Sequence, residues 1–533
     1  MKNKIALILI LLAAFFIRIY SINWDQGFHL HPDERMLIMV ADRINFFKNF
    51  NPDFFNYGSL PVYILKGFSQ LIDFVFNKNL ANYDGMLTIG RKLSVFFDLI
   101  TIYVIYKIAK KLFNKKKIAL FTCFFYAIAF FPIQNSHFFV VDVFLNTLIT
   151  GLIYTLLIYF RSPSIKKNFL IGIIFASMMA TKFTAIIFYP LIVILLLLMN
   201  LKKWKTLVFS LFIFHFSFFI FHFVFMPYAY FEHVRFISDI KAQLEMNSNS
   251  YIFPYTLQYV GTLPYLYYLK NIFLWGLGPV ISILSLIGLF FYLKFKNFNL
   301  FRISDFGFRI LFLAIYLVYF LIIGRSAVKF MRYMLPLYPF FAILAGYGLY
   351  KFYKRSRFIG IILIIGSLVW CLMFNNIYSQ THTRIAATDW IIKNIPEGKT
   401  LAVEHWDDRV PIYGGEKYNY EEMTLYEQPD DENKWKVLNE KLTKTDYIII
   451  ASNRLYIPLQ KLDDCKKYKS CYPKTAEYYH ELFNDELPFR KVAEISVYPG
   501  FQIFNFKFQI KDDSADESFT VYDHPKILIF KKY

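Results

Sequence analysis

Long apolar runs that lack any charged side chain are the feature that most constrains how this chain can fold. Thr206–Phe225 and Phe358–Phe374 contain no Asp, Glu, Lys or Arg. A helix of this length crosses most or all of the roughly 30 Å hydrocarbon core of a bilayer. Only 18% of the 533 residues are charged, below the roughly 25% of soluble domains. The sequence therefore predicts a polytopic membrane protein.

Eleven apolar segments are predicted to be transmembrane helices, so the expected fold class is a polytopic α-helical membrane protein. The predicted spans are residues 5–22, 91–112, 118–134, 139–160, 168–182, 184–200, 206–226, 271–293, 307–324, 333–350 and 358–375. The segment Leu60–Phe76 carries Lys66 and Asp73, so we expect an interfacial or re-entrant helix there. The first apolar run lacks a small-residue cleavage site after it, which favours a first span over a cleaved signal peptide.

Loops rich in lysine and arginine set the expected orientation. They are residues 1–4, 107–117, 161–167, 201–205, 294–302 and 351–357. Because cytoplasmic loops are enriched in Lys and Arg, eleven alternating spans place all of them in the cytoplasm. The long loops 23–89 and 227–270 and the C-terminal part then lie outside the plasma membrane. The net charge of +20 resides largely in these loops, so no nucleic-acid partner is expected.

The composition changes near Asn375, which predicts two domains: a membrane domain at 1–375 and an extracytoplasmic soluble domain at 376–533. The tail alternates strand-like runs at 401–406, 446–452 and 526–532 with helical stretches at 388–394 and 476–483. This pattern predicts a mixed α/β domain. Cys465 and Cys471 both lie in it, on the oxidising side, where either a disulfide or two free thiols fit the sequence.

Charged residues in or beside the spans are the first candidates for function, because burying a charge at membrane depth is costly. His31-Pro-Asp-Glu34 follows the first span. Its carboxylates suit a general base that takes a proton from an acceptor, or ligands of a divalent cation. A plain helix start is the competing interpretation, with proline at the first position and acidic residues in the first turn.

Asp142 is the second acidic candidate, a few residues inside an otherwise apolar span. Its alternative role is a carboxylate satisfied by Asn146 or Ser136, because an unpaired carboxylate would be expensive there. Nearby His137 joins Asp33, Glu34 and Asp142 as an alternative set of metal ligands. Their spacing does not decide whether a metal is needed.

Cations are expected at the same outer membrane face. They are Arg91 and Lys92, Lys182, and the group Arg325, Lys329 and Arg332. Interface anchoring or snorkelling is the alternative for the first three, whereas the last group runs against the orientation rule and indicates a function. Guanidinium and ammonium groups bind phosphate. With no Walker loop or dinucleotide turn in the sequence, the set favours a lipid-borne phosphate donor.

Several short motifs occur together along the chain. They are HPDE at 31–34, GRKLSVFFD at 90–98, QNSHFFVVD at 134–142, TKFTA at 181–185, KFMRYMLPLYP at 329–339, EHWDD at 404–408 and DDSADESFTVYDHPK at 512–526. In this combination the sequence resembles the phospholipid-carrier-dependent glycosyltransferases of the GT-C superfamily, relatives of the protein O-mannosyltransferases and lipid A aminoarabinose transferases. The resemblance implies sugar transfer from a polyprenyl-phosphate carrier to an acceptor, with inversion at the anomeric carbon.

The resemblance also implies roles for individual residues. Asp33 is the expected base of the acidic pair with Glu34, and Asp142 the second acidic residue, which positions a substrate. The donor phosphate would be held by Arg91, Lys182, Lys329 and Arg332. Weaker candidates for the sugar or acceptor cleft, where packing is the competing role, are His31, His137, Tyr57, Tyr255 and Tyr265. The sugar, the carrier length and the acceptor (protein, lipid or glycan) are left open.

Two other functions compete with this interpretation. A lipid or polysaccharide transporter without transferase chemistry would use the same cations, but we expect inverted repeats and helix breaks in it, and the sequence shows neither. An oligosaccharyltransferase-like enzyme of the same superfamily would carry a WWD-type acceptor motif. Here Trp406-Asp-Asp408 stands alone.

Overall fold

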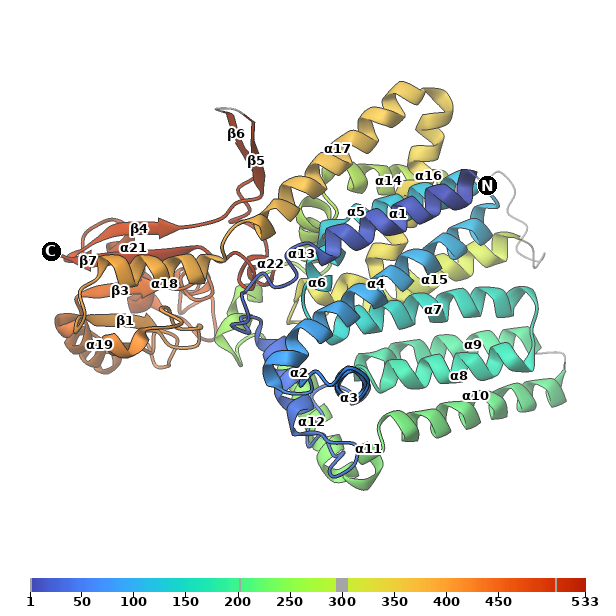
Figure 1. Ribbon diagram of the computed structural model, residues 1–533, viewed down its shortest axis with the longest axis horizontal. Coiled ribbons are helices and arrows are strands. Elements are labelled where there is room, and N and C mark those ends of the chain that lie inside the picture. The colour runs from blue at the N-terminus through green and yellow to red at the C-terminus, as the bar shows by residue number, and fades with distance from the viewer. Residues whose placement is uncertain (1, 201–202, 294–304, 504–505) are drawn as a thin grey trace. The chain divides into compact units, whose positions relative to one another are not determined.

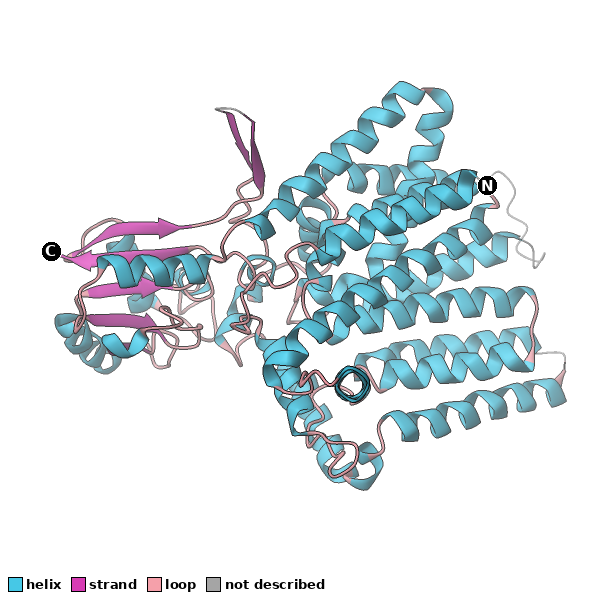
Figure 2. Cartoon of the chain, viewed as in Figure 1, coloured by secondary structure: helices cyan, strands magenta, loops and turns pink. Residues whose placement is uncertain are grey.

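The computed structural model describes residues 2–200, 203–293, 305–503 and 506–533 (Figure 1). The chain separates into two compact units. The first consists of Met1–Asn23, His31–Glu245 and Leu263–Leu372, and the second of Trp24–Leu30, Met246–Thr262 and Met373–Tyr533. Figure 2 shows that the first unit is helical and that the strands lie in the second. Two short segments from the predicted outer loops thus join the C-terminal part of the chain.

Each of the eleven predicted apolar segments contains a helix. The helices up to residue 375 are α1 (Lys2–Ile19), α2 (Pro32–Arg43), α3 (Leu60–Phe76), α4 (Tyr83–Phe113), α5 (Lys116–Ile128), α6 (Phe130–Ser136), α7 (Val141–Arg161), α8 (Ile165–Met179), α9 (Phe188–Asn200), α10 (Trp204–Phe225), α11 (Tyr228–Phe231), α12 (His233–Ser248), α13 (Leu266–Asn271), α14 (Pro279–Leu293), α15 (Asp305–Ile323), α16 (Tyr338–Arg355) and α17 (Arg357–Asn375). Helices α7, α8 and α10 lie side by side (Figure 1). The expected loop 294–302 and part of the loop 201–205 lie outside the described residues.

Within the described residues, five helical stretches are long and apolar enough to cross a membrane. The number is six if the bent pair α5 and α6 forms one span, and α14 and residues 309–323 are shorter apolar helices. The chain is therefore a multi-pass membrane protein. The number of eleven spans stays a prediction.

Three predicted spans differ in detail from the helices observed. The segment 118–134 is two helices that meet at an angle of 58°. The segment 333–350 begins with the 3₁₀ turn η4 (Met331–Leu337), which contains Pro336. The segment 271–293 begins with the π-helical turn Ile272–Gly276 and is interrupted at Gly278, which has φ +80°, before α14 begins at Pro279. Proline favours a first helical position, and glycine adopts positive φ without steric cost.

A buried polar network joins four helices of the first unit. Arg18 of α1 donates from Nε to Oδ2 of Asp98 in α4 over 2.6 Å, and Tyr126 of α5 donates to the other carboxylate oxygen over 2.7 Å. Asn146 of α7 donates to the Tyr126 hydroxyl over 2.8 Å, so the expected alternative partner of Asp142 is engaged elsewhere. All four side chains are buried. Sequence analysis did not single out Arg18 or Asp98.

The second unit contains a five-stranded mixed sheet with the order β2-β1-β3-β7-β4. The strands are β1 (Thr400–Glu404), β2 (Asn419–Met423), β3 (Tyr447–Ile450), β4 (Phe489–Ile495) and β7 (Ile527–Lys532), while β5 (Gly500–Ile503) and β6 (Phe506–Gln509) form a separate hairpin. Strand β1 is parallel to β2 and β3, and β7 is antiparallel to β3 and β4. The predicted strand runs correspond to β1, β3 and β7.

Helices cover both faces of this sheet, as the alternation of side chains along its strands requires. The helices of the second unit are α18 (Thr383–Asn394), α19 (Glu432–Lys444), α20 (Tyr456–Lys461), α21 (Pro473–Phe483) and α22 (Glu517–Thr520). Ile448 and Ile450 of β3 pack in one apolar core with α19 and α21, whereas Tyr447 and Ile449 pack in another with α18. The predicted helical stretches at 388–394 and 476–483 lie in α18 and α21. Cys465 and Cys471 form a disulfide.

Candidate active site

Helix α2 carries the HPDE motif and begins within it. Pro32 occupies the first helical turn, and Nδ1 of the capping residue His31 accepts the Glu34 N–H over 3.4 Å. The expectation that this motif starts a helix is confirmed. Neighbouring helical residues point about 100° apart, so Asp33 and Glu34 have different surroundings.

Glu34 is committed to a buried ion pair with Arg91 of α4. Its two carboxylate oxygens lie 2.9 and 2.7 Å from Nε and Nη2 of the guanidinium, and the Phe139 N–H also donates to it over 2.8 Å. Arg91 further donates to the Ile22 carbonyl over 2.9 Å. Both side chains are almost completely buried. This pair fastens α2 to α4 and to the segment before α7.

Asp33 instead belongs to a cluster of four charged side chains. The Arg332 guanidinium, from η4, contacts the Asp33 carboxylate and lies 3.9 Å from Oδ2 of Asp142 in α7. Lys182, which follows α8, donates to Oδ1 of Asp142 over 2.8 Å. The side chain of Asp33 is 19% exposed and that of Asp142 5%. The structure therefore brings together four of the residues chosen from the sequence, and Asp33 is the more accessible carboxylate.

Aromatic rings border this cluster. The Tyr57 hydroxyl lies 3.5 Å from Oδ1 of Asp33. The Lys182 ammonium lies 4.7 Å from the centre of the Tyr333 ring, and the Arg332 guanidinium lies 4.7 Å from that of Phe330. Rings at this distance favour cations through their quadrupole. Sequence analysis missed Tyr333 and Phe330, and the signal that could have found them is the KFMRY motif that contains both.

The charges fix the protonation state of Asp33. Burial raises its pKa, but the Arg332 guanidinium, assisted by His31 and Lys182, outweighs burial and holds the pKa below its usual range. Burial, reinforced by the Asp33 charge, raises the pKa of the Tyr57 hydroxyl well above its ordinary value. At neutral pH, Asp33 is therefore a carboxylate and Tyr57 is a neutral hydroxyl.

The remaining candidates contact other groups. The Lys329 ammonium donates to the Ala327 carbonyl over 3.0 Å, and the Tyr265 hydroxyl donates to the Leu321 carbonyl over 3.2 Å. The two ring nitrogens of His137 lie 2.9 and 3.0 Å from the backbone carbonyl oxygens of Ile133 and Tyr20. Tyr255 belongs to the second unit.

The alternative metal set of Asp33, Glu34, Asp142 and His137 is not assembled as a ligand group. Across the described ranges, no group of three or more His, Cys, Asp or Glu side chains is placed to hold a metal ion. Glu34 is occupied by Arg91, and His137 contacts backbone carbonyls.

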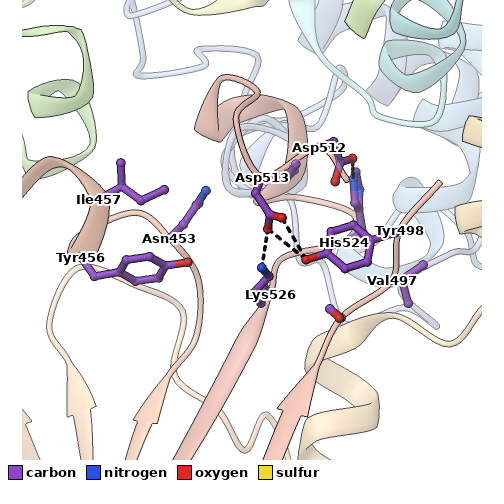
Figure 3. Close-up of a pocket in the computed structure, with 11 residues that line it drawn as sticks. Asn453, Tyr456, Ile457, Val497, Tyr498, Asp512, Asp513, His524 and Lys526 are labelled. Carbon is purple, nitrogen blue, oxygen red and sulfur yellow. Dashed lines mark hydrogen bonds and ion pairs between the residues drawn. The ribbon is translucent and has the colours of Figure 1, made fainter. Parts of the chain in front are cut away.

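A further group of charges lies in the second unit, around a pocket built partly from the 512–526 motif (Figure 3). Asp513 is paired with Lys526 there, and His524 lies between Asp512, 2.9 Å away, and Asp523. Burial lowers the pKa of His524, but the two carboxylates outweigh it and raise the pKa to about 10. These ion pairs fix the segment that precedes β7, which gives the charged residues of this motif a structural role.

Comparisons with known proteins agree with the resemblance seen in the sequence. Residues 87–231, which include Arg91, Asp142 and Lys182, match the family model of dolichyl-phosphate-mannose-protein mannosyltransferases. No curated protein sequence matches.

Several solved structures are similar at low identity, and they include the following three. One is the Saccharomyces cerevisiae protein O-mannosyltransferase Pmt1-Pmt2 complex bound to the sugar donor (15% identity, TM-score 0.34, 44% of this chain and 34% of that chain). The others are ArnT from Cupriavidus metallidurans bound to undecaprenyl phosphate (14% identity, TM-score 0.44, 86% and 94%) and in the apo state (13%, 0.46, 85% and 94%). The similarity to the yeast chain thus spans about a third of that chain's length.

Proposed function

We propose that this chain is a membrane glycosyltransferase of the GT-C superfamily that transfers a sugar from a polyprenyl-phosphate carrier to an acceptor, and the match to protein mannosyltransferases over residues 87–231 supports this. The observation that carries the proposal is the partly exposed, ionised Asp33 beside Arg332, with the Asp142–Lys182 pair next to it. This set combines a base with two cations, which is what sugar transfer from a lipid phosphate requires.

In the proposed reaction Asp33 is the general base. Its carboxylate takes the proton from the acceptor hydroxyl or amine while the acceptor atom attacks the anomeric carbon. The bond from that carbon to the phosphate oxygen breaks, and its electron pair stays on the phosphate. A single displacement of this kind inverts the anomeric centre. A phosphate leaves without added acid, so one carboxylate base suffices.

Arg332 and Lys182 are proposed to stabilise the departing polyprenyl phosphate. Both contact carboxylates here, so they are held as a pair of cations beside the base. Preplaced charges need little reorganisation when negative charge develops on the leaving group. Asp142 is proposed to keep the two cations in position, because it lies within 4 Å of both.

The site is proposed to face outward from the plasma membrane. The support is the distribution of Lys and Arg in the short loops of the sequence. The same reasoning places the second unit outside the cytoplasm, where the Cys465–Cys471 disulfide is chemically stable.

The proposal is tested with the reconstituted protein and a panel of polyprenyl-phosphate sugars, by measuring release of free polyprenyl phosphate. Envelope extract supplies acceptors. Asp33→Asn is compared with Asp53→Asn, a change at an exposed carboxylate of the same predicted loop. We expect release by the wild type and by Asp53→Asn but not by Asp33→Asn. Absence of release from every donor would contradict the transferase and favour transport.

A further inference from the structure

Five rings gather in the second unit around Trp406, and we call them the Trp406 platform: Phe253, Tyr255, His405, Trp406 and Tyr426. The rings of Phe253 and Tyr255 stack at 5.2 Å with an interplanar angle of 7°. Trp406 lies 6.1 Å from Phe253, 6.4 Å from Tyr255 and 5.9 Å from Tyr426. His405 stacks on Tyr426 at 5.8 Å. Although Trp406 contacts several rings, 41% of its surface is exposed.

The backbone at Trp406 is strained. Its φ is +74°, a left-handed conformation that is rare for a bulky side chain and costs about 1–3 kcal/mol. Such strain persists only where several surrounding contacts fix the conformation, and strained residues are concentrated at functional sites.

The chain on either side of Trp406 is fixed by hydrogen bonds and by a buried ion pair. The His405 N–H donates to the Met423 carbonyl over 3.0 Å. Asp407 forms an ion pair with Arg384 at 2.9 Å between two side chains that are 1% exposed, and it also accepts the Ser452 hydroxyl. Contacts on both sides therefore hold the backbone of the exposed Trp406 in an unfavourable conformation, which is expected if the indole is held for a ligand.

The position of the platform in the sheet supports a binding role. His405 and Trp406 directly follow β1, and Tyr426 lies three residues beyond β2, so both contributions come from the carboxyl ends of parallel strands. Ser452, which anchors the turn, follows the parallel strand β3. Ligands of open α/β sheets bind at this edge of the strands.

Charged groups border the rings. The Glu422 side chain is 60% exposed and lies 2.9 Å from Nδ1 of His405. The Arg454 guanidinium lies 6.0 Å from the centre of the Tyr255 ring. The Arg454 guanidinium is fixed by an ion pair with Glu517 at 2.7 Å. The platform therefore combines the exposed Trp406 ring and partly exposed neighbouring rings with an exposed carboxylate, Glu422, that accepts hydrogen bonds.

We propose that the Trp406 platform binds a saccharide chain. A sugar ring has an apolar C–H face that packs against an aromatic face, and hydroxyls around its rim that pair with carboxylates and guanidinium groups. A lipid chain offers no hydroxyl to donate to the Glu422 carboxylate, which is 60% exposed beside His405. In the context of the proposed function, on which this part of the inference rests, the saccharide is the acceptor or part of it.

The test measures binding of mannohexaose, maltohexaose and chitohexaose to the full-length protein in nanodiscs by titration calorimetry, without any donor. The variants are Trp406→Ala, Trp406→Phe and Tyr426→Ala, with Trp204→Ala as matched control, since Trp204 is 73% exposed in the first unit. We expect at least one oligosaccharide to bind the wild type. Trp406→Ala and Tyr426→Ala should weaken it by about tenfold or more, Trp406→Phe less, and Trp204→Ala not at all.

Unchanged oligosaccharide affinity in Trp406→Ala would overturn the proposal. Failure of all three oligosaccharides to bind the wild type would also overturn the proposal. This includes the case in which a Ser/Thr-rich acceptor peptide binds instead and its binding depends on Trp406. Thermal unfolding of each variant shows whether it is folded. If Trp406→Ala is not folded, the affinity of Trp406→Phe is compared with that of the wild type instead. Because no donor is present, this measurement is independent of sugar transfer, so it can succeed where the transferase proposal fails and fail where it succeeds.

Discussion

Arg332 and Asp33, which are 299 positions apart in the sequence, form an ion pair at the first turn of α2. The pair joins the HPDE motif to the KFMRY motif. Arg332 also reaches Asp142 at 3.9 Å, so a single guanidinium links two of the three carboxylates that the sequence marked as candidates. Its charge opposes the effect of burial and lowers the pKa of Asp33.

Replacing Arg332 with Gln should shift the pH dependence of transfer. Burial then raises the pKa of Asp33 without the opposing guanidinium, and the carboxylate must lose its proton before it can serve as a base. The acidic limb of the kcat/KM profile should therefore move to higher pH, while Arg332→Lys keeps the charge and moves it less. If kcat/KM falls at every pH while its acidic limb stays at the same pH, Arg332 does not set the Asp33 pKa.

Breaking the Glu34–Arg91 pair should destabilise the first unit. Arg91→Met leaves Glu34 buried without its charged partner, and loss of one partner from a buried pair costs about 3–5 kcal/mol. Lys92→Met, at the exposed neighbouring position, is the control and should have little effect. The measurement is thermal unfolding in detergent. Equal unfolding temperatures for the two variants would argue against a structural role for the pair.

The Arg18–Asp98 pair should show strong coupling in a double-mutant cycle. Arg18→Leu and Asp98→Leu each leave one buried charge unpaired, whereas the double variant removes both. Each single change is expected to cost about 3 kcal/mol or more, and the double change less than the sum. Thermal unfolding of the four proteins provides the comparison. Additive effects would mean that the two side chains do not stabilise each other.

His524 should make the stability of the second unit depend on alkaline pH. Its folded-state pKa is about 10, above the ordinary 6.5, so the folded state favours the protonated ring. This contribution is complete below about pH 6.5 and is lost as the pH rises towards 10. His524→Gln should lower the unfolding temperature at pH 7 and flatten its decline to pH 10, compared with the exposed control His480→Gln. An equally steep decline in His524→Gln would contradict this role.

Each predicted apolar segment contains a helix, because an apolar run is a local property of the sequence, whereas the number of helices that cross the membrane stays a prediction. Asp33, Asp142, Lys182 and Arg332 were found because a charge at membrane depth is expensive wherever it lies. The partners could not be predicted in the same way. That Glu34 rather than Asp33 pairs with Arg91 depends on how α2 is rotated against α4, which local sequence does not encode.

Long-range assembly explains the other differences. Residues 24–30 and 246–262 join the C-terminal part of the chain, although composition placed them in outer loops of the membrane domain. Arg18 lies near the end of the first predicted span and Asp98 lies inside the second, so the cost of a charge at membrane depth applied to both although neither was chosen. The sequence showed Trp406 only as part of the short motif EHWDD, because no sequence signal predicts a positive φ at a tryptophan.

The account depends most directly on Asp33 acting as a base rather than as a binding group. The decisive measurement is donor binding and turnover in the same reconstituted samples of wild type, Asp33→Asn and Asp53→Asn. We expect Asp33→Asn to bind the polyprenyl-phosphate sugar within a few-fold of wild type while its rate of polyprenyl-phosphate release falls by about 10²–10⁴, and Asp53→Asn to match wild type in both. Wild-type turnover in Asp33→Asn would contradict the account.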